Sequence, residues 1–219
     1  MRRTGRLWAG ILAGAMLMTS ASAATADLLA AVSSGNLAEV SRLIAAGTDL
    51  EQRDGQGQTP LLRAVAGNHV AVAKALLAAG ASLNAQAANQ DTPWLLAGAS
   101  GRSEIIAAML PLKPDLSLRN RYGGDALIPA CERAHVETVK LLLTSGIDVN
   151  HVNNLGWTCL LEIVILGDGG PRHQQVAKLV LDAGANPNLA DKDGVSPLAH
   201  ARKRGQSEVA KLITAAGGR

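Results

Sequence analysis

Residues 54–84 read DGQGQTPLLRAVAGNHVAVAKALLAAGASLN, and the features of this stretch recur along the chain. The tripeptide Thr59-Pro60-Leu61 has counterparts at regular distances: Thr92-Pro93-Trp94 after 33 residues, then Asp125-Ala126-Leu127 and Thr158-Cys159-Leu160 at the same step, and Ser196-Pro197-Leu198 after 38. A second marker agrees, because Gly47, Gly80, Gly146, Gly184 and Gly217 are separated by 33, 66, 38 and 33 residues. Self-similarity at such a period predicts a stack of repeated units, with five extra residues in the fifth.

Each unit has the signals of two helices joined by a turn. Thr59 is a good N-cap, and Pro60 is tolerated next to it because the first helical N–H has no partner anyway. Gly67-Asn68 supplies the turn after a short Ala-rich helix, since both residue types tolerate a left-handed conformation. A helical apolar stripe follows from Val70, and Gly80 suits the position just past the end of that second helix.

The whole pattern, Asp-x-x-Gly-x-Thr-Pro-Leu through Leu-Leu-x-x-Gly-Ala-x-x-Asn, resembles the ankyrin repeat from Asp27 onwards. The resemblance implies an all-α solenoid of helix-turn-helix units with projecting hairpin-like loops. It divides the domain 27–219 into about six repeats: 27–53, 54–86, 87–119, 120–152, 153–190 with an insertion at 167–173, and 191–219.

Two repeats depart from the pattern. In the third, Pro111 predicts a shortened second helix, and Lys113 replaces the usual Gly. In the fourth, Asp125-Ala126 replaces Thr-Pro, and Pro129 falls inside the first helix. The local geometry between these two repeats is therefore the least determined by the pattern.

Residues 1–26 have the composition of a cleavable signal peptide. Arg2, Arg3 and Arg6 precede an apolar run from Leu7 to Met18, which is followed by small residues suited to cleavage. The run is too short to span a bilayer, for which about 20 residues are needed. Arg2-Arg3 is a weak match to a twin-arginine signal, and a plain cationic start is the favoured interpretation. We expect no membrane insertion and a periplasmic location, or an extracellular one if the source is Gram-positive.

The charge that remains argues against nucleic-acid binding. The chain has 21 Lys and Arg and 18 Asp and Glu, and three of the bases belong to the signal. The remaining chain is formally neutral, whereas a nucleic-acid binder usually has a basic domain.

No constellation predicts catalysis, a metal site or a cofactor. His69 and His135 occupy a position at which ankyrin repeats commonly have a structural His, and the other histidines are scattered. Gly167-Asp168-Gly169-Gly170 lacks the Lys-Ser/Thr of a phosphate-binding loop. We expect the insertion 167–173 to be a loop between two helices, either a partner-contact element or a tolerated lengthening.

Cys131 and Cys159 are expected on neighbouring stacked helices. A disulfide is possible in an exported protein if their Cα atoms come within about 7 Å, which the sequence does not determine. Of the two interpretations, buried free thiols are favoured.

Candidate partner-binding residues lie on the projecting loops and the adjoining end of the first helices. They are Arg53, Gln56, Gln58, Asn89, Asp91, Arg121, Tyr122, Glu132, Arg133, Asn154, Leu155, Trp157, Lys192 and Asp193. Tyr122 and Trp157 are the most interesting, because exposed aromatic residues are typical interface anchors. For Trp157 the alternative is that it only covers a neighbouring loop.

The resemblance implies a non-enzymatic module that binds a protein partner, and we expect a monomer that acts as an adaptor or chaperone-like binder in the cell envelope. Some small exported ankyrin proteins are linked to oxidative-stress defence. The resemblance therefore implies a similar role for this chain. The alternatives are a secreted effector that binds a host protein and, less favoured, an enzyme on an ankyrin scaffold.

Overall fold

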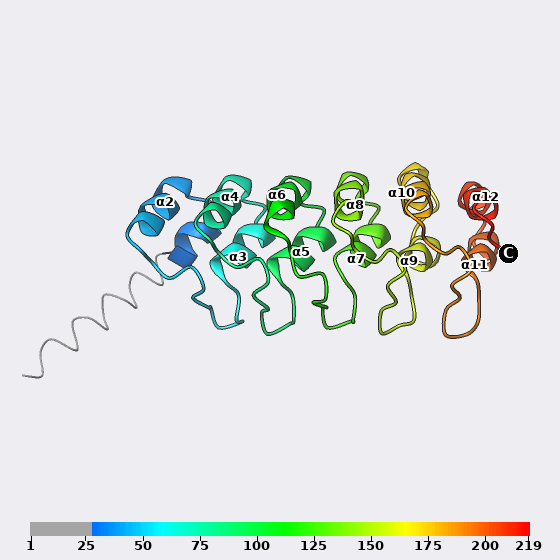
Figure 1. The fold of residues 1–219 in the computed structure, drawn as a ribbon, viewed down its shortest axis with the longest axis horizontal. Coiled ribbons are helices and arrows are strands. Elements are labelled where there is room, and N and C mark those ends of the chain that lie inside the picture. Colours follow the sequence, from blue (N-terminus) through cyan, green and yellow to red (C-terminus); the bar gives the residue numbers. More distant parts are fainter. Residues whose placement is uncertain (1–27) are drawn as a thin grey trace, which may run out of the picture.

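The computed structural model describes residues 28–219, and these form one elongated stack of helix pairs (Figure 1). The predicted signal peptide 1–26 lies outside the described residues. After a helical segment at 28–33, the described helices are α2 (Leu37–Ala45), α3 (Pro60–Ala66), α4 (Val70–Ala78), α5 (Pro93–Ala99), α6 (Ser103–Met109), the 3₁₀ helix η1 (Leu110–Leu112), α7 (Leu127–Glu132), α8 (Val136–Leu143), α9 (Cys159–Ile165), α10 (Pro171–Asp182), α11 (Pro197–Lys203) and α12 (Ser207–Ala215). The described residues contain no strand, so the predicted all-α solenoid is confirmed.

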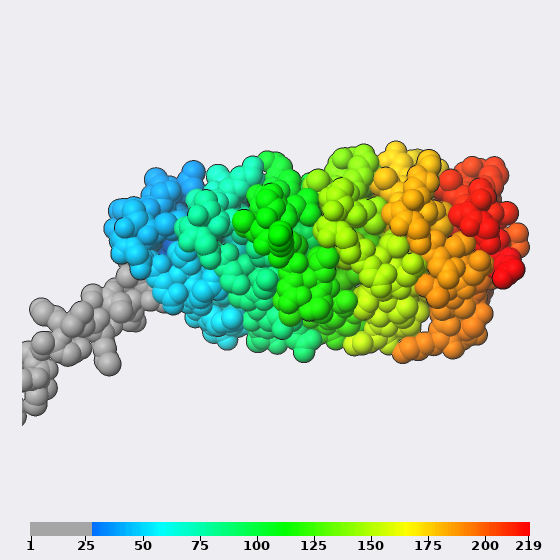
Figure 2. Space-filling model, in the orientation of Figure 1, coloured from blue at the N-terminus to red at the C-terminus, as the bar shows by residue number. Residues whose placement is uncertain are grey.

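The helices form two rows with loops projecting from one side. The first helices of the repeats, α3, α5, α7, α9 and α11, make one row beside the loops, and the second helices make the other (Figure 1). The space-filling view shows the repeats side by side in chain order along the long axis (Figure 2). Within the described part of the chain, no helix is both long and apolar enough to cross a bilayer.

The predicted N-caps are present. The hydroxyls of Thr59, Thr92 and Thr158 accept hydrogen bonds from the backbone N–H three residues on, at 3.3, 3.1 and 3.2 Å. Asp125 performs the same task in the fourth repeat, where its Oδ1 accepts from Leu127 N and Ile128 N at 2.9 and 3.1 Å. Each cap satisfies donors that a helix leaves unpaired at its start.

The atypical third repeat ends as Pro111 predicts. Helix α6 stops at Met109, a single 3₁₀ turn carries the chain to Leu112, and Lys113 takes a left-handed conformation with φ 54° where other repeats have Gly. Pro129 is accommodated in the first turn of the short α7. Proline costs little there because the N–H of that turn would be unpaired.

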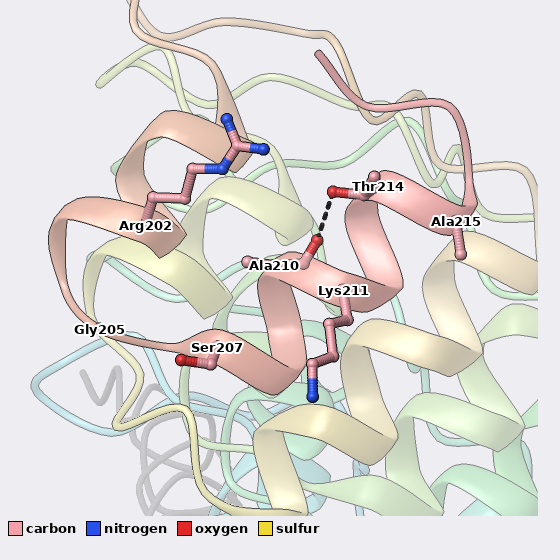
Figure 3. Close-up of a pocket in the computed structure, with 7 residues that line it drawn as sticks. All are labelled: Arg202, Gly205, Ser207, Ala210, Lys211, Thr214 and Ala215. Atoms are coloured by element: carbon pink, nitrogen blue, oxygen red, sulfur yellow. Dashed lines mark hydrogen bonds between the residues drawn. The ribbon is translucent and has the colours of Figure 1, made fainter.

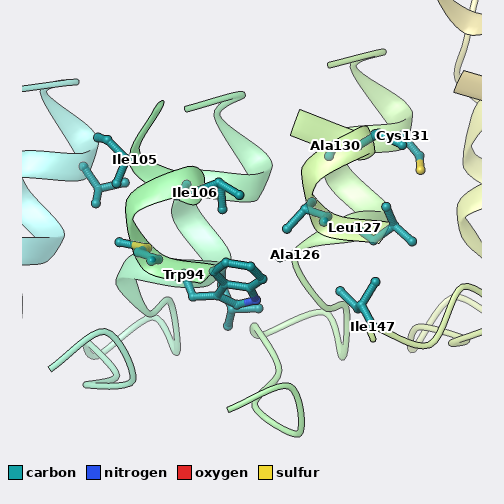
Figure 4. Close-up of a cluster of buried hydrophobic side chains, with 14 of the residues drawn as sticks. Trp94, Ile105, Ile106, Ala126, Leu127, Ala130, Cys131 and Ile147 are labelled. Carbon is teal, nitrogen blue, oxygen red and sulfur yellow. The ribbon is translucent and has the colours of Figure 1, made fainter. Parts of the chain in front are cut away.

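The core runs continuously through the stack. Trp94 is 2% exposed and belongs to one buried cluster with Ile105, Ile106 and the α7 residues Leu127 and Ala130 of the next repeat (Figure 4). Gly98 permits this close approach, because a Cβ there would lie 2.5 Å from Ala126 O. Each fully buried Leu or Ile contributes about 2 kcal/mol, so stacking neighbours stabilises units that are too small to fold alone.

Cys131 and Cys159 form a disulfide, with Cα atoms 5.5 Å apart, so the expectation of free thiols is wrong. Cys131 is at the end of α7 and Cys159 begins α9, and the two helices pack closely against each other. The sequence left this open because the distance between the two cysteines depends on how consecutive repeats stack.

The insertion 167–173 also differs from the prediction of a loop. Residues 171–173 form the first turn of α10, a helix of 12 residues where α8 has 8, and 167–170 are the connection. Pro171 starts that turn because its fixed φ suits the first helical position. His173 thereby bonds Glu132 O at 2.9 Å, much as His69 bonds Ser33 O at 3.2 Å in an earlier repeat. The extra residues are absorbed without losing this bond between repeats.

Candidate functional site

A pocket of about 190 Å³ lies where repeats four and five meet, between the projecting loops and the helices α7 and α9. Its lining comes from two loops and two helices. The residues are Asn120, Tyr122, Gly124, Ile128, Pro129, Glu132, Asn153, Leu155, Trp157, Glu162 and Leu166.

The loops present their side chains because an Asn organises each of them. Asn120 Oδ1 accepts from Tyr122 N and Gly124 N at 2.9 and 3.0 Å, and Asn153 Oδ1 accepts from Leu155 N and Trp157 N at 2.9 and 3.0 Å. A further bond of 2.9 Å from Asn154 N to Tyr122 O joins the two loops. Hydrogen bonds from backbone amides to these Asn side chains and to the neighbouring loop therefore hold the loop tips in place. The other side chains of the loops project from this fixed backbone.

The rim of the pocket is apolar and exposed. Tyr122, Leu155 and Leu166 are 53%, 51% and 50% exposed, and they are three of the six exposed large hydrophobic side chains among residues 28–219. Trp157 is half-buried, packs against the core and lines the pocket. A gathering of exposed apolar side chains around one hollow is a feature of binding surfaces.

The floor is acidic. Glu162 on α9 is 5% exposed; its Oε1 accepts from Asn153 Nδ2 at 3.0 Å, while Oε2 has no hydrogen-bond partner among the described residues. Burial, followed by the nearby carboxylate of Glu132, raises the pKa of Glu162 to about 7, against the lowering effect of the hydrogen bond from Asn153. The pocket lining contains neither Lys nor Arg.

Equivalent positions in two other repeats have the opposite arrangement. There the loop residue is an acid and the helix residue nine positions later is a base: Asp54 with Arg63 at 3.7 Å, and Asp191 with His200 at 2.7 Å. Repeat five has Asn153 and Glu162 instead. The acid therefore sits on the helix, and no base accompanies it.

The structure brings together four of the predicted partner-binding residues, Tyr122, Glu132, Leu155 and Trp157. Several of the others make contacts within the scaffold. Arg53 donates to Gln86 O at 2.5 Å, Arg133 to Ala99 O at 2.8 Å, and Lys192 to Asn154 O at 2.5 Å, and Asn89 bonds Asp91 at 2.8 Å. Arg121 lies over the Tyr122 ring, 4.5 Å from its centroid. Gln56, Asn154 and Asp193 are exposed, and Gln58 is half-buried.

Sequence reasoning missed Asn153, Glu162 and Leu166. Leu166 follows the end of α9, where the repeat pattern marks only a turn. A signal for Glu162 existed, because the spacing of nine residues places it level with Arg63 and His200. Reading that position across the repeats would have shown an acid where the other two have a base.

A second hollow, of about 580 Å³, lies on the outer side of the last repeat (Figure 3). It is lined by Arg202, Gly205, Ser207, Ala210, Lys211, Thr214 and Ala215. Two of its polar groups have partners on their own helix: Thr214 Oγ1 donates to Ala210 O at 2.8 Å, and Lys211 Nζ donates to Glu208 at 2.7 Å. This is the end of the stack, where no further repeat covers the helices, and we do not take it as the candidate site. Residues 28–219 also hold no group of three or more His, Cys, Asp or Glu suited to a metal ion.

The projecting loops and the first helices α3, α5, α7, α9 and α11 form one side of the stack, called the groove below (Figure 1). A stack of repeats with such a side belongs to the class of repeat scaffolds that present an extended binding surface. The family model for ankyrin repeats (three copies) matches residues 28–120, 94–191 and 127–218. The chain belongs to the ankyrin-repeat family, and its repeats make it a protein–protein interaction module, of a kind that is typically non-enzymatic.

Two bacterial relatives match over nearly their full length, and a human domain over most of its length. The chain is 41% identical over 193 residues to the ankyrin repeat protein YahD of Escherichia coli (strain K12), covering 88% of this chain and 96% of that protein. An ankyrin repeat domain from Acinetobacter baumannii AYE is 48% identical with a TM-score of 0.84, covering 88% of this chain and 98% of that one. The human ASB11 ankyrin repeat domain is 26% identical with a TM-score of 0.72, covering 88% of this chain and 84% of that one.

Proposed function

We propose that this protein is an exported adaptor or chaperone-like binder that holds one partner protein in the groove formed by its loops and first helices. The observation that carries the proposal is the pocket between repeats four and five. Exposed aromatic and aliphatic side chains surround a small hollow there. The loops that carry them are fixed by hydrogen bonds from backbone amides to Asn side chains.

Pre-organisation is the physical reason why this surface suits binding. Neighbouring loops are tied at Asn154 N–Tyr122 O, and His151 Nε2 lies 2.7 Å from Gly123 O. A rigid surface loses little conformational entropy when a partner arrives, so more of the contact energy becomes affinity. Aromatic residues such as Tyr122 and Trp157 then supply much of that energy.

The predicted signal peptide 1–26 and the Cys131–Cys159 disulfide support export. Stable disulfides form in oxidising compartments such as the periplasm and are rare in the cytosol. A link to oxidative-stress defence is part of the proposal only through the family resemblance. Export is tested by alkaline phosphatase fused after residue 219, which is active only outside the cytoplasm, against a fusion that lacks residues 1–26.

Site-specific photo-crosslinking in cells tests the binding surface. p-Benzoylphenylalanine at Tyr122 should give one discrete adduct that mass spectrometry identifies. In a separate pull-down with the purified protein as bait, Tyr122→Ala with Trp157→Ala should abolish capture of that protein. The matched control places the same probe at Lys140, which is exposed on α8 in the other row of the same repeat. Equal adducts from both positions, or none from Tyr122, would contradict the proposal.

A further inference from the structure

We propose that the pocket between repeats four and five binds an arginine side chain of the partner protein, with the guanidinium against Glu132, above the buried Glu162, and its flat face against the aromatic rim. The inference rests on the proposed function, because it names the chemistry that the groove recognises. It assigns a role to Glu162, which the fold alone does not require.

Glu162 is an unusual residue for this floor. A buried carboxylate is normally paired with a base or fully hydrogen-bonded, since removing a charge from water is costly. Here one oxygen has a single amide donor and the other has none among the described residues. The polar group is therefore only half satisfied by its own chain.

Other repeats show that the fold does not need an acid there. Asp54–Arg63 and Asp191–His200 perform the same loop-to-helix link with a base on the helix. In repeat five the link is kept by Asn153, while the charge on the helix is reversed. Together with Glu132 on α7, this gives the pocket two carboxylates from adjacent repeats and no cation.

The surroundings favour a cation with a flat, weakly hydrated head. Guanidinium carries five donors and can serve both carboxylates, and it stacks on aromatic rings more often than an ammonium does. Tyr122 already stacks with Arg121 of this chain, at 4.5 Å from the ring centroid, so its ring accepts such a partner. The apolar rim of Leu155 and Leu166 suits the aliphatic stem of an arginine.

Direct contact with both oxygens of Glu162 is not required. Its Oε2 is covered, so the guanidinium first meets Glu132, which is half-buried at the pocket. Charges a few ångströms apart interact strongly where protein rather than water lies between them. Above its pKa of about 7, the ionised Glu162 therefore strengthens binding from beneath the site.

The test is a titration of the purified protein with capped amino acids, followed by ¹H–¹⁵N NMR at the amides of Tyr122, Leu155 and Leu166. N-acetyl-arginine amide should give saturable shifts in the millimolar range. Its neutral isostere, N-acetyl-citrulline amide, should bind at least about tenfold more weakly. Capped citrulline binding as well as arginine, or capped lysine binding more tightly, would overturn the proposal.

Variants locate the charge that matters. Glu162→Gln and Glu132→Gln should each weaken arginine binding by roughly tenfold, which corresponds to about 1.4 kcal/mol. Glu137→Gln is the matched control: it removes the same charge from an exposed position on α8, outside the pocket lining, and should change nothing. Equal losses in all three variants would mean only net charge acts, and the proposal would fail.

The outcomes separate this inference from the proposed function. A partner crosslinked at Tyr122 without arginine binding would leave the groove as an interface and reject the basic occupant. Arginine binding without any crosslinked partner would keep the pocket chemistry but remove the adaptor role. Shifts at these amides that grow with protein concentration, before any ligand is added, would assign the pocket to a second copy of the chain and reject a different partner.

Discussion

Repeats two and six solve the same structural problem as repeat five with opposite charges. In repeats two and six an acidic loop residue meets a base on the first helix, and the two side chains are paired within the repeat. In repeat five Asn153 meets Glu162, and an acid is left under the groove. The pairing in repeats two and six stabilises the scaffold, while repeat five gives up part of that stability by keeping a buried acid beneath the pocket. Such a trade of stability for function is common at binding sites.

The disulfide gives the largest expected effect, because it joins the two repeats that form the pocket and no other pair in the described chain has one. Cys131→Ala with Cys159→Ala should lower the free energy of unfolding by about 3 kcal/mol, since the bond closes a loop across a sequence separation of 28 residues. Guanidinium unfolding followed by circular dichroism measures this. Dithiothreitol should destabilise the native protein and leave the variant unchanged; an unchanged midpoint in the variant would show that stacking alone holds the two repeats.

Glu162→Gln should stabilise the protein by on the order of 2 kcal/mol at pH 8, even though it weakens the proposed binding. The pKa of Glu162 is raised from 4.5 to about 7 in the folded chain, so the folded state holds its proton over that range while the unfolded state releases it. Stability of the native protein therefore falls as pH rises from about 4.5 through about 7. The advantage of the variant should disappear below pH 4.5. Chemical unfolding at pH 4.5 and pH 8 measures it, with Glu137→Gln as control.

The effect of the reversed charge can be tested by replacing both residues with the acid and base found in repeat two. Asn153→Asp with Glu162→Arg gives repeat five the polarity of Asp54 and Arg63, and should remove the fall in stability between about pH 4.5 and 7. Asn153→Asp alone places a second acid beside Glu162 and should be less stable than the native protein at pH 8. A double variant no more stable than this single one would show that the site cannot accept a base.

Asp191→Asn should give the smallest effect and the opposite pH dependence. Hydrogen bonds from Val195 N, the His200 side chain and Asp193 N hold the pKa of Asp191 below its usual 3.8. A lowered folded pKa means that Asp191 stabilises the protein above its unfolded pKa and loses that contribution as pH falls through the folded value. The variant should therefore be slightly less stable at pH 7 and equal to the native protein in strong acid. Thermal unfolding at both pH values measures it, and a difference that persists in strong acid would contradict this account.

Periodicity alone predicted the all-α solenoid because the unit is local. Caps such as Thr59 and Thr158, left-handed turns and apolar stripes act within a few residues, so they can be read directly from sequence spacing. Pro111 and Lys113 likewise predicted the shortened second helix of repeat three. Four of the predicted binding residues meet at the pocket, because the repeat fixes which positions face the groove.

The tertiary structure decided what depends on distances between repeats. The sequence left the state of the two cysteines open, and the stacking of α7 on α9 brings their Cα atoms to 5.5 Å. The sequence predicted a loop at the insertion 167–173, whereas in the structure residues 171–173 form an extra helical turn in which His173 bonds Glu132 O. The sequence contained Glu162, but its burial and its approach to Glu132 arise only when two repeats pack together. Local sequence signals determine the helix pair of each repeat. The packing of neighbouring repeats determines which side chains are buried beside the pocket and how far apart they lie.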